Sequence, residues 1–168
     1  MMKQFVPQEV CLKCQGCCRF SSMDSVWSPY LLEEEIQELL DKDIPPALID
    51  INRRVRPVPE PAKDTFICAF FNAQENKCKI YGLRPFECQL YPFLLNLRDG
   101  KVLLTVDLHC PYIKEKLESR ELKEYIAYLS DYLNSPKQLQ LLKGNPQILQ
   151  AYEDVMELLE LEAFDETK

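Results

Sequence analysis

Eight cysteines dominate the chemistry that this sequence of 168 residues could perform. Four of them fall within eight residues, in the run Cys11-Leu12-Lys13-Cys14-Gln15-Gly16-Cys17-Cys18. A thiolate prefers soft or borderline metals, so sites built from cysteine alone select zinc or iron–sulfur clusters. We therefore interpret all eight cysteines as candidate metal ligands. They are Cys11, Cys14, Cys17, Cys18, Cys68, Cys78, Cys88 and Cys110.

The spacing of three of these cysteines favours an iron–sulfur cluster. Cys11, Cys14 and Cys17 are separated by two residues each, and a remote Cys110 is followed by proline. Bacterial ferredoxins hold four-iron clusters with a similar pattern, so we interpret these four as the cluster ligands. Zinc sites more often pair two such runs or add histidines, and this chain has one run and one histidine, His109. Zinc is the alternative cofactor.

The number of metal centres is left open by the sequence. Eight thiols could form two four-ligand sites, or one site with spare thiols. Cys17 and Cys18 are adjacent, and neighbouring side chains diverge, so one of them is expected to serve a second centre or to lie buried. Four cations lie near cysteines and are expected to offset the negative charge of a thiolate site or to hydrogen-bond to sulfur, namely Arg19, Arg84, Lys13 and Lys79, although the two lysines fit incidental surface positions equally well.

Short elements are expected to position the thiols. Residues 11–18 contain one glycine and few apolar side chains, which indicates a tight coil. Residues 65–71 and 77–81 are rich in aromatic and β-branched side chains, and they predict a hairpin that brings Cys68 near Cys78. A second hairpin is predicted from 92–97 and 101–106.

Helices are expected on both sides of these hairpins. Ser28-Pro29 is typical of a helix start, followed by apolar residues at helical spacing as far as Leu40. After residue 112 the sequence predicts three helices without a cysteine, the last two starting at Ser135-Pro136 and Asn145-Pro146. The apolar face expected for the last helix consists of Ile148, Leu149, Tyr152, Val155, Met156 and Leu159.

The fold class that follows is α+β. We expect a small cysteine-ligated core with short β-hairpins, followed by a C-terminal helical segment. Residues 1–168 are predicted to form a single domain, with a metal-binding core at 11–111 and a helical cover at 112–168.

Charge and composition exclude several classes of function. A net charge of −7 argues against a nucleic-acid surface. No stretch has the length or flanks of a signal peptide or a membrane span, so we expect a cytoplasmic protein without a membrane partner. Thiols stay reduced there, which favours metal ligation over disulfides. A redox or protein partner is expected, whereas the sequence assigns neither a reaction nor an oligomeric state.

In these features the chain resembles the bacterial and archaeal cysteine-cluster family, whose domain is described as zinc- or iron-chelating. The residues that carry the resemblance are, in order, Cys11-x2-Cys14-x2-Cys17-Cys18-Arg19, Cys68, Cys78-Lys79-Ile80-Tyr81, Arg84-Pro85-x2-Cys88-x2-Tyr91-Pro92 and Cys110. They follow the family order across roughly residues 11–111. The resemblance implies metal chelation by the cysteines. Together with the spacing, it supports an iron–sulfur protein in electron transfer or redox sensing, with a zinc-stabilised protein-interaction module as the alternative.

Overall fold

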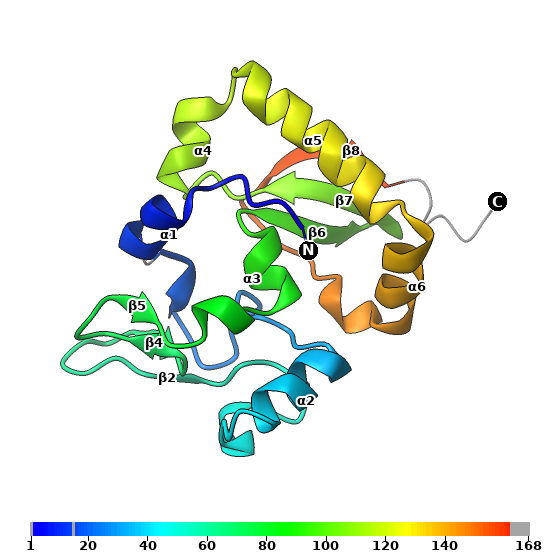
Figure 1. Cartoon of the computed structure of the whole chain (residues 1–168). Helices are drawn as coiled ribbons and strands as arrows, with labels where there is room; N and C mark the ends of the chain where they lie inside the picture. Colours follow the sequence, from blue (N-terminus) through cyan, green and yellow to red (C-terminus); the bar gives the residue numbers. More distant parts are fainter. Residues whose placement is uncertain (1, 15, 162–168) are drawn as a thin grey trace. The chain divides into compact units, whose positions relative to one another are not determined.

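A computed structural model describes residues 2–14 and 16–161 of the chain (Figure 1). The chain forms two compact units. Val6–Gln89 is called the cysteine unit here, and Met1–Phe5 together with Leu90–Lys168 is called the sheet unit. This division differs from the core and cover expected to meet at residue 111. That residues 1–168 form one domain stays a prediction.

The cysteine unit is built from short elements. In chain order they are α1 (Gln8–Cys14), η1 (Gly16–Cys18), β1 (Arg19–Phe20), α2 (Glu33–Leu40), η2 (Pro46–Leu48), β2 (Pro57–Pro59), β3 (Phe66–Cys68), β4 (Phe71–Asn72), β5 (Lys77–Cys78), η3 (Tyr81–Leu83) and α3 (Phe86–Leu90), which ends at the unit boundary. The strands form an antiparallel sheet of order β1-β3-β2 and an antiparallel β4-β5 pair. Pro57 and Pro59 are tolerated because β2 is an edge strand.

The hairpin expected from 65–71 and 77–81 is confirmed only where β4 pairs with β5. The long first strand breaks after Cys68, and β3 pairs with β1 and β2 instead. Phe70 and Phe71 are both buried. Because a continuous strand would point consecutive side chains to opposite faces, the break allows both rings to enter the core.

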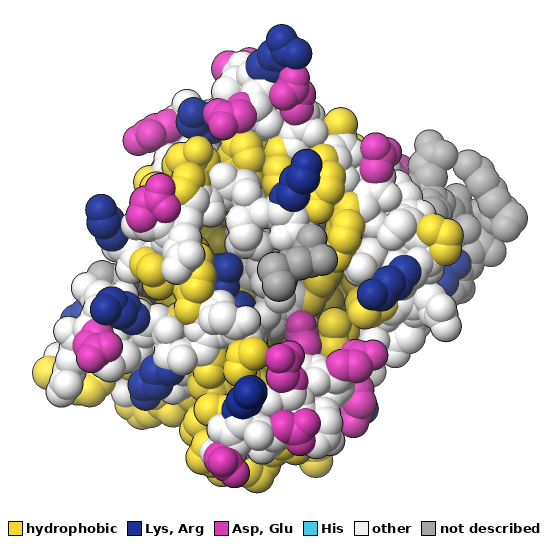
Figure 2. Space-filling model, in the orientation of Figure 1, with side chains coloured by type: hydrophobic (Ala, Val, Ile, Leu, Met, Phe, Trp, Pro, Cys, Tyr) yellow, Lys and Arg dark blue, Asp and Glu magenta, His cyan; other side chains and the backbone are white. Residues whose placement is uncertain are grey.

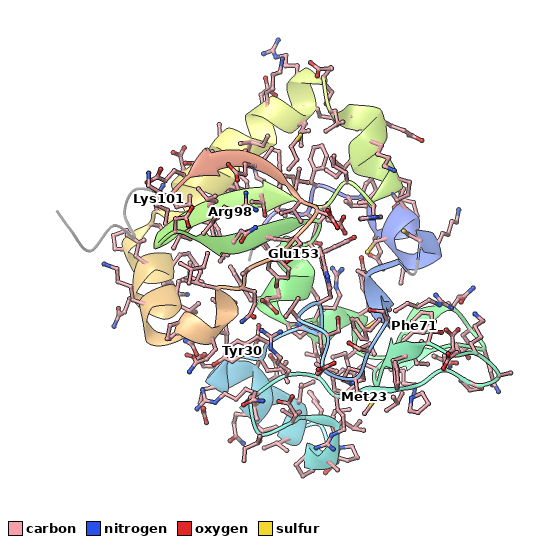
Figure 3. The ribbon with its side chains drawn as sticks, turned by 180° about the vertical axis from the view of Figure 1, so that it is seen from behind. Met23, Tyr30, Phe71, Arg98, Lys101 and Glu153 are labelled. Atoms are coloured by element: carbon pink, nitrogen blue, oxygen red, sulfur yellow. The ribbon has the colours of Figure 1, made fainter. Side chains whose placement is uncertain are left out.

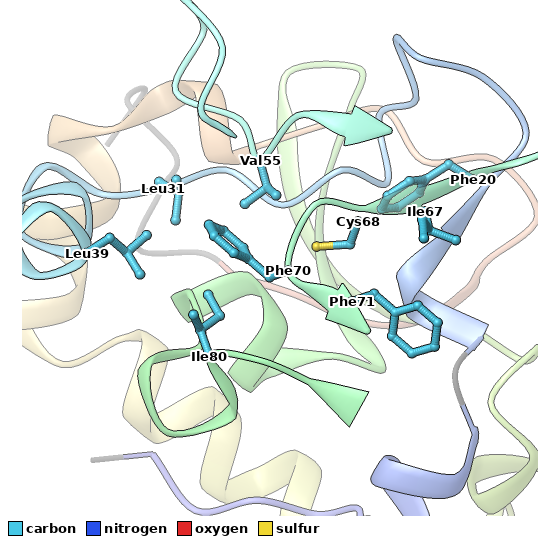
Figure 4. Packing of buried hydrophobic residues seen from close by; sticks show 9 residues of the cluster. All are labelled: Phe20, Leu31, Leu39, Val55, Ile67, Cys68, Phe70, Phe71 and Ile80. Carbon is cyan, nitrogen blue, oxygen red and sulfur yellow. The ribbon is translucent and has the colours of Figure 1, made fainter. Parts of the chain in front are cut away.

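A cluster of buried apolar residues packs together in the cysteine unit (Figure 4). Cys68 lies within this core beside Ile67 and Phe70, so its sulfur has apolar neighbours. The buried members of the core are Phe20, Leu31, Leu39, Val55, Ile67, Cys68, Phe70, Phe71 and Ile80.

The helix expected from Ser28-Pro29 begins later, at Glu33. The preceding residues are extended, because the Val55 N–H donates to the Pro29 carbonyl and the Leu31 N–H donates to the Arg53 carbonyl. These backbone bonds compete successfully with a helix start. Acidic side chains gather over α2, with three of them in its first turn, near the positive end of the helix (Figure 2).

The coil expected at residues 11–18 was wrong. Cys11 and Cys14 lie in α1, and Cys17 and Cys18 lie in the single turn η1. The turn that starts α1 is closed by Pro7, whose carbonyl accepts the N–H of Cys11 at 3.0 Å. Helical spacing places Cys11 and Cys14 one turn apart.

The sheet unit is formed by the hairpin β6 (Phe93–Arg98) and β7 (Lys101–Val106), to which β8 (Met156–Glu160) adds as the third antiparallel strand. Its helices are α4 (Pro111–Lys116), α5 (Arg120–Leu133), α6 (Pro136–Gly144) and the short η4 (Pro146–Ile148). The predicted hairpin turn is confirmed, because Asp99 and Gly100 both have positive φ.

The last predicted helix was wrong. Only η4 starts at Pro146, and Met156–Glu160 forms β8 along the edge of β7. Ion pairs from the hairpin reach β8, since Arg98 pairs with Glu157 and Lys101 pairs with Glu160. Figure 3 shows Arg98 and Lys101 together at the turn end of the hairpin. Strand pairing with a partner about fifty residues earlier in the chain decided against the helix that local spacing suggested.

Aromatic side chains join the N-terminal segment to the sheet and to α5. The Phe5 ring lies 6.0 Å from that of Phe93 on β6 and 5.0 Å from that of Tyr125 on α5. The Tyr125 hydroxyl donates to the Lys3 carbonyl at 2.6 Å, and the Lys3 N–H donates to the Tyr128 hydroxyl at 2.9 Å. Residues 3–5 are therefore an integral part of the sheet unit.

The described elements confirm the α+β fold class. Among residues 2–14 and 16–161, no helix combines the length and apolar character that crossing a membrane requires.

Candidate metal centre

Six of the eight cysteines line one pocket in the cysteine unit. The pocket encloses about 60 Å³, and most of its lining is apolar. Pro29, Val55, Phe70 and Phe71 contribute to this lining. The six cysteines are Cys11, Cys17, Cys18, Cys68, Cys78 and Cys88.

These thiols come from five different elements. Cys11 is on α1, Cys17 and Cys18 are on η1, Cys68 ends β3, and Cys78 ends β5. The sixth, from the Arg-Pro-x2-Cys motif, lies in the middle of α3. The pairing of Phe71 with Cys78 keeps β5 close to the end of β3. The hairpin that was expected to bring two cysteines together therefore contributes to this pocket.

The remaining two cysteines lie elsewhere. Cys14 is exposed at the end of α1. Cys110 belongs to the sheet unit, where it is buried and directly precedes α4. His109, also in the sheet unit, hydrogen-bonds through Nδ1 to Asp107 at 2.8 Å. The four cysteines expected to hold a cluster thus include two that line the pocket and two that are placed elsewhere.

The six thiols share one pocket, but their side chains do not surround a common point closely enough to bind one ion. Within residues 2–14 and 16–161, no group of three or more cysteine, histidine, aspartate or glutamate side chains stands in a position to hold one ion. No disulfide joins any of the eight cysteines. Chelation by several pocket thiols therefore requires their side chains to move closer together.

The pocket raises the pKa of four of its thiols. Burial raises the pKa of Cys68 to about 12, and burial also raises the pKa of Cys78 and of Cys88. A hydrogen bond with the Cys18 side chain is the main cause of the raised pKa of Cys17, followed by burial. Although Cys17 is exposed as a residue, its thiol faces these groups in the pocket. At neutral pH these four are uncharged thiols, and a metal that binds them must displace their protons.

Arg84 supplies a cation at the wall of the pocket. Its Nη1 lies 3.8 Å from the Cys11 sulfur, and its guanidinium lies 3.7 Å from the centre of the Tyr81 ring. Its Nε donates to the Tyr81 carbonyl at 3.1 Å. The charge of Arg84 acts to lower the pKa of Cys17 and of Cys78, against the larger effects that raise them. The expectation that Arg84 accompanies the thiols agrees with this position.

Two carboxylates hold α3 in place. Glu35 on α2 accepts the Phe86 N–H at 2.6 Å and the Leu32 N–H at 2.9 Å. Glu87 accepts the Tyr30 N–H at 2.5 Å. Burial raises the pKa of Glu35 to about 7. Glu35 of α2 thus binds the backbone at the start of α3, and Glu87 of α3 binds the backbone just before α2. Together they fix the helix that carries the last pocket cysteine.

A third carboxylate fixes the strand that follows Cys18. Glu60 is buried and accepts hydrogen bonds from Lys63 at 2.8 Å, Thr65 at 2.9 Å and Arg19 at 3.2 Å. The hydrogen bond from Lys63, followed by that from Thr65, lowers the pKa of Glu60 to about 2. Arg19 therefore serves to anchor β1, in addition to lying over the Phe71 ring.

The donor set of the pocket fits a soft or borderline metal. Of the described residues, those that line the pocket include six thiols and neither a carboxylate nor an imidazole. Magnesium and calcium require oxygen ligands, whereas zinc and iron–sulfur clusters accept thiolates. Several residues around the site had no signal in the sequence. Pro29 and Val55 reach the pocket through backbone pairing, and Glu35 and Glu87 act through backbone N–H groups far away in sequence.

Comparison with known proteins agrees with this chemistry. Residues 10–125 match the family model "CxxCxxCC: Putative zinc- or iron-chelating domain". A curated protein of Methanocaldococcus jannaschii, "Uncharacterized protein MJ0661", is 44% identical over 41 residues, which are 24% of this chain and 22% of that protein. The chain thus spans about a fifth of the length of that relative. No solved structure matches the chain.

Proposed function

The chain belongs to the CxxCxxCC family of zinc- or iron-chelating domains, and from this premise we propose that its pocket thiols hold an iron–sulfur cluster used in electron transfer or redox sensing. The observation that carries the proposal is the convergence of six thiols on one largely apolar cavity. A structural zinc ion needs four ligands in a closed site. A water molecule needs about 10–15 Å³ of such space, so a cavity of about 60 Å³ favours a group larger than one ion.

Four of the six thiols are the best candidates for ligands. Cys17, Cys68, Cys78 and Cys88 interact electrostatically in every pairwise combination, each pair raising a pKa within the set. Four ligands of one metal centre must lie close enough to one another for their charges to interact in this way. Cys11 and Cys18 flank this set. The spacing-based assignment of Cys11, Cys14, Cys17 and Cys110 is the competing ligand set, and individual substitutions distinguish the two.

The surroundings support a redox role for such a cluster. Cluster potentials depend on net charge, on hydrogen bonds to sulfur and on solvent exposure. The pocket offers a largely apolar lining, a nearby cation in Arg84 and backbone N–H groups at Cys68 and Cys78. A redox partner and a reducing, cytoplasmic compartment are parts of this proposal, because cysteines that are not joined in disulfides are typical of a reducing compartment.

A zinc-stabilised protein-interaction module is the second candidate. It is favoured by large apolar side chains that are exposed on the cysteine unit, where a partner protein could cover them. Ile51 is 97% exposed, Met23 is 47% exposed and Val26 is 42% exposed. In this case the metal would only hold the pocket together, and the exposed side chains would provide the binding surface.

Metal analysis of protein purified without oxygen tests the proposal. Iron and acid-labile sulfide in equal amounts, with visible absorption that bleaches on reduction, are the expected results. Colourless protein with one zinc ion per chain would exclude the cluster and leave the interaction module. Protein without any bound metal, which takes up neither iron and sulfide nor zinc on reconstitution, would contradict both.

A further inference from the structure

We propose that Arg84, held beside Cys11 at the wall of the pocket, is a positioning residue that balances the negative charge of the metal-bound thiolates and thereby sets the affinity and the redox potential of the centre, with Tyr81 holding its guanidinium in place. This inference rests on the metal-binding function proposed above. It assigns a specific task to two side chains that are not themselves ligands.

The guanidinium of Arg84 is held in a defined position by several contacts. Its central carbon lies 3.7 Å from the centre of the Tyr81 ring, and its Nε donates to the Tyr81 carbonyl at 3.1 Å. The carbonyl of Arg84 itself accepts a hydrogen bond from Gln89 Nε2 at 2.7 Å. The same guanidinium also lies beside Cys11, with Nη1 3.8 Å from the sulfur. Both the backbone and the charged group are therefore fixed beside the thiols.

Cys11 differs from Cys68 and Cys78 in the kind of group that interacts with its sulfur. Backbone N–H groups of Phe70 and Phe71 serve Cys68, and that of Ile80 serves Cys78. Cys11 lies beside two side chains, the cation of Arg84 and the phenol of Tyr81, and burial raises the pKa of Tyr81, with a further contribution from its interaction with Cys11. Side-chain donors can be removed by substitution while the backbone stays intact, so this part of the site is open to a direct test.

The charge of the site explains why a cation is needed. Four thiolates with a divalent ion, or with a cluster, leave a net negative charge in a largely apolar pocket. Each cysteine thiolate is negative only after the metal has displaced its proton, so Arg84 stabilises the loaded pocket more than the empty one. Reduction adds a further electron, so Arg84 should stabilise the reduced centre more than the oxidised one. Removal of this cation should therefore weaken metal binding and lower the midpoint potential.

Lys79 provides a matched control. It carries the same charge and follows Cys78 directly in the sequence, but it is exposed and does not line the pocket. A cation that acts only through its general proximity would have the same effect at position 79. A cation that acts through a fixed contact with sulfur would have an effect only at position 84.

The test compares the variants Arg84→Met, Arg84→Lys, Tyr81→Phe and Lys79→Met of the full chain. Affinity is measured with cobalt(II) by competition against a chelator, and the midpoint potential is measured after reconstitution with iron and sulfide. Substitution of residues that surround metal ligands commonly costs 10–100-fold in affinity. We expect about a tenfold loss of cobalt affinity and a lower potential in Arg84→Met, smaller changes in the same direction in Arg84→Lys and Tyr81→Phe, and wild-type values in Lys79→Met.

The outcomes separate this inference from the proposed function. Wild-type affinity and potential in Arg84→Met would overturn the inference while leaving metal binding intact. Equal losses in Arg84→Met and Lys79→Met would also overturn it, because the effect would be one of general charge. A wild-type chain that binds no metal would instead refute the function itself. If Arg84→Met does not fold, Arg84→Lys decides, since it keeps a positive charge but loses the guanidinium contacts with Tyr81 and Cys11, and unchanged affinity and potential in that variant contradict the inference.

Discussion

The carboxylate of Glu35 on α2 accepts a hydrogen bond from the backbone N–H of Phe86, the first residue of α3, at 2.6 Å across 51 positions of the sequence. Two residues further along α3 lies Cys88, which faces the thiol pocket. The position of this cysteine therefore depends on an acidic side chain that belongs to none of the cysteine motifs.

Glu35 should make stability depend on pH in an unusual direction. Burial raises its pKa from 4.5 to about 7, so between these values the folded protein binds more protons than the unfolded chain. Stability is fully present below pH 4.5 and falls as the pH rises through 7, by at most about 3 kcal/mol from this group. Denaturant unfolding of the metal-free protein at several pH values, compared with Glu35→Gln, should show this trend in the difference. Parallel curves for the two proteins would contradict it, and Glu38→Gln on the same helix is the exposed control.

Glu60 should have the opposite dependence. The hydrogen bond from Lys63 leads the lowering of its pKa to about 2, so its contribution is present above pH 4.5 and is lost as the pH falls through 2. Glu60→Gln should therefore unfold at lower denaturant concentration at pH 7 and approach the wild type in acid. The exposed neighbour Asp64 allows Asp64→Asn as the control. A difference between wild type and Glu60→Gln that does not change with pH would show that charge is not the cause.

Metal affinity should rise with pH. Burial is the main cause that raises the pKa of Cys68, Cys78 and Cys88, so at neutral pH each of these thiols releases a proton when it binds a metal. We expect the dissociation constant for zinc to fall by about a factor of ten per pH unit for each proton displaced. Titration calorimetry in buffers of different ionisation enthalpy counts these protons. A dissociation constant that is the same at pH 6 and pH 8 would mean that the pocket thiols are not the ligands.

Serine substitution of single cysteines should divide the eight into classes. Cys68→Ser and Cys88→Ser should lose metal and lower the thermal midpoint, because both thiols line the pocket. Cys14→Ser should retain metal, because that thiol is exposed at the end of α1. The metal content and the melting curve of each variant show whether the substituted thiol binds the metal. Loss of metal in Cys14→Ser and Cys110→Ser, with retention in Cys68→Ser, would support the ferredoxin-like ligand set instead.

The sequence identified the thiols and several local turns, for reasons that are themselves local. Asp99-Gly100 marked the hairpin because both residues adopt positive φ, and Ser135-Pro136 marked the start of α6, where Ser135 is the N-cap and Pro136 is the first residue. The same kind of local reasoning failed for Met156–Glu160, whose strand depends on the distant β7. It also failed for residues 11–18, where a coil was expected but Cys11 and Cys14 lie in the helix α1, which starts at Gln8.

The composition of the pocket could be predicted only in part. Cys68 and Cys78 were expected together because a short turn joins their strands. The roles of Val55 and Pro29 depend on backbone pairing between segments that no turn connects directly. The stacking of Arg84 on Tyr81 depends on the path of η3, for which the sequence shows no periodicity.

The cysteine unit is inserted in the chain between two stretches that both belong to the sheet unit. Its first residue follows Phe5, its last precedes Leu90, and the ring of Phe5 packs 6.0 Å from that of Phe93. A chain segment whose ends are held together has fewer conformations when it unfolds. The packing of the sheet unit, including that of Phe5 against Phe93, already supplies the entropy cost of bringing these ends together. Loss of the metal should therefore leave the thiols within a confined search volume, so that reloading does not have to start from a free chain.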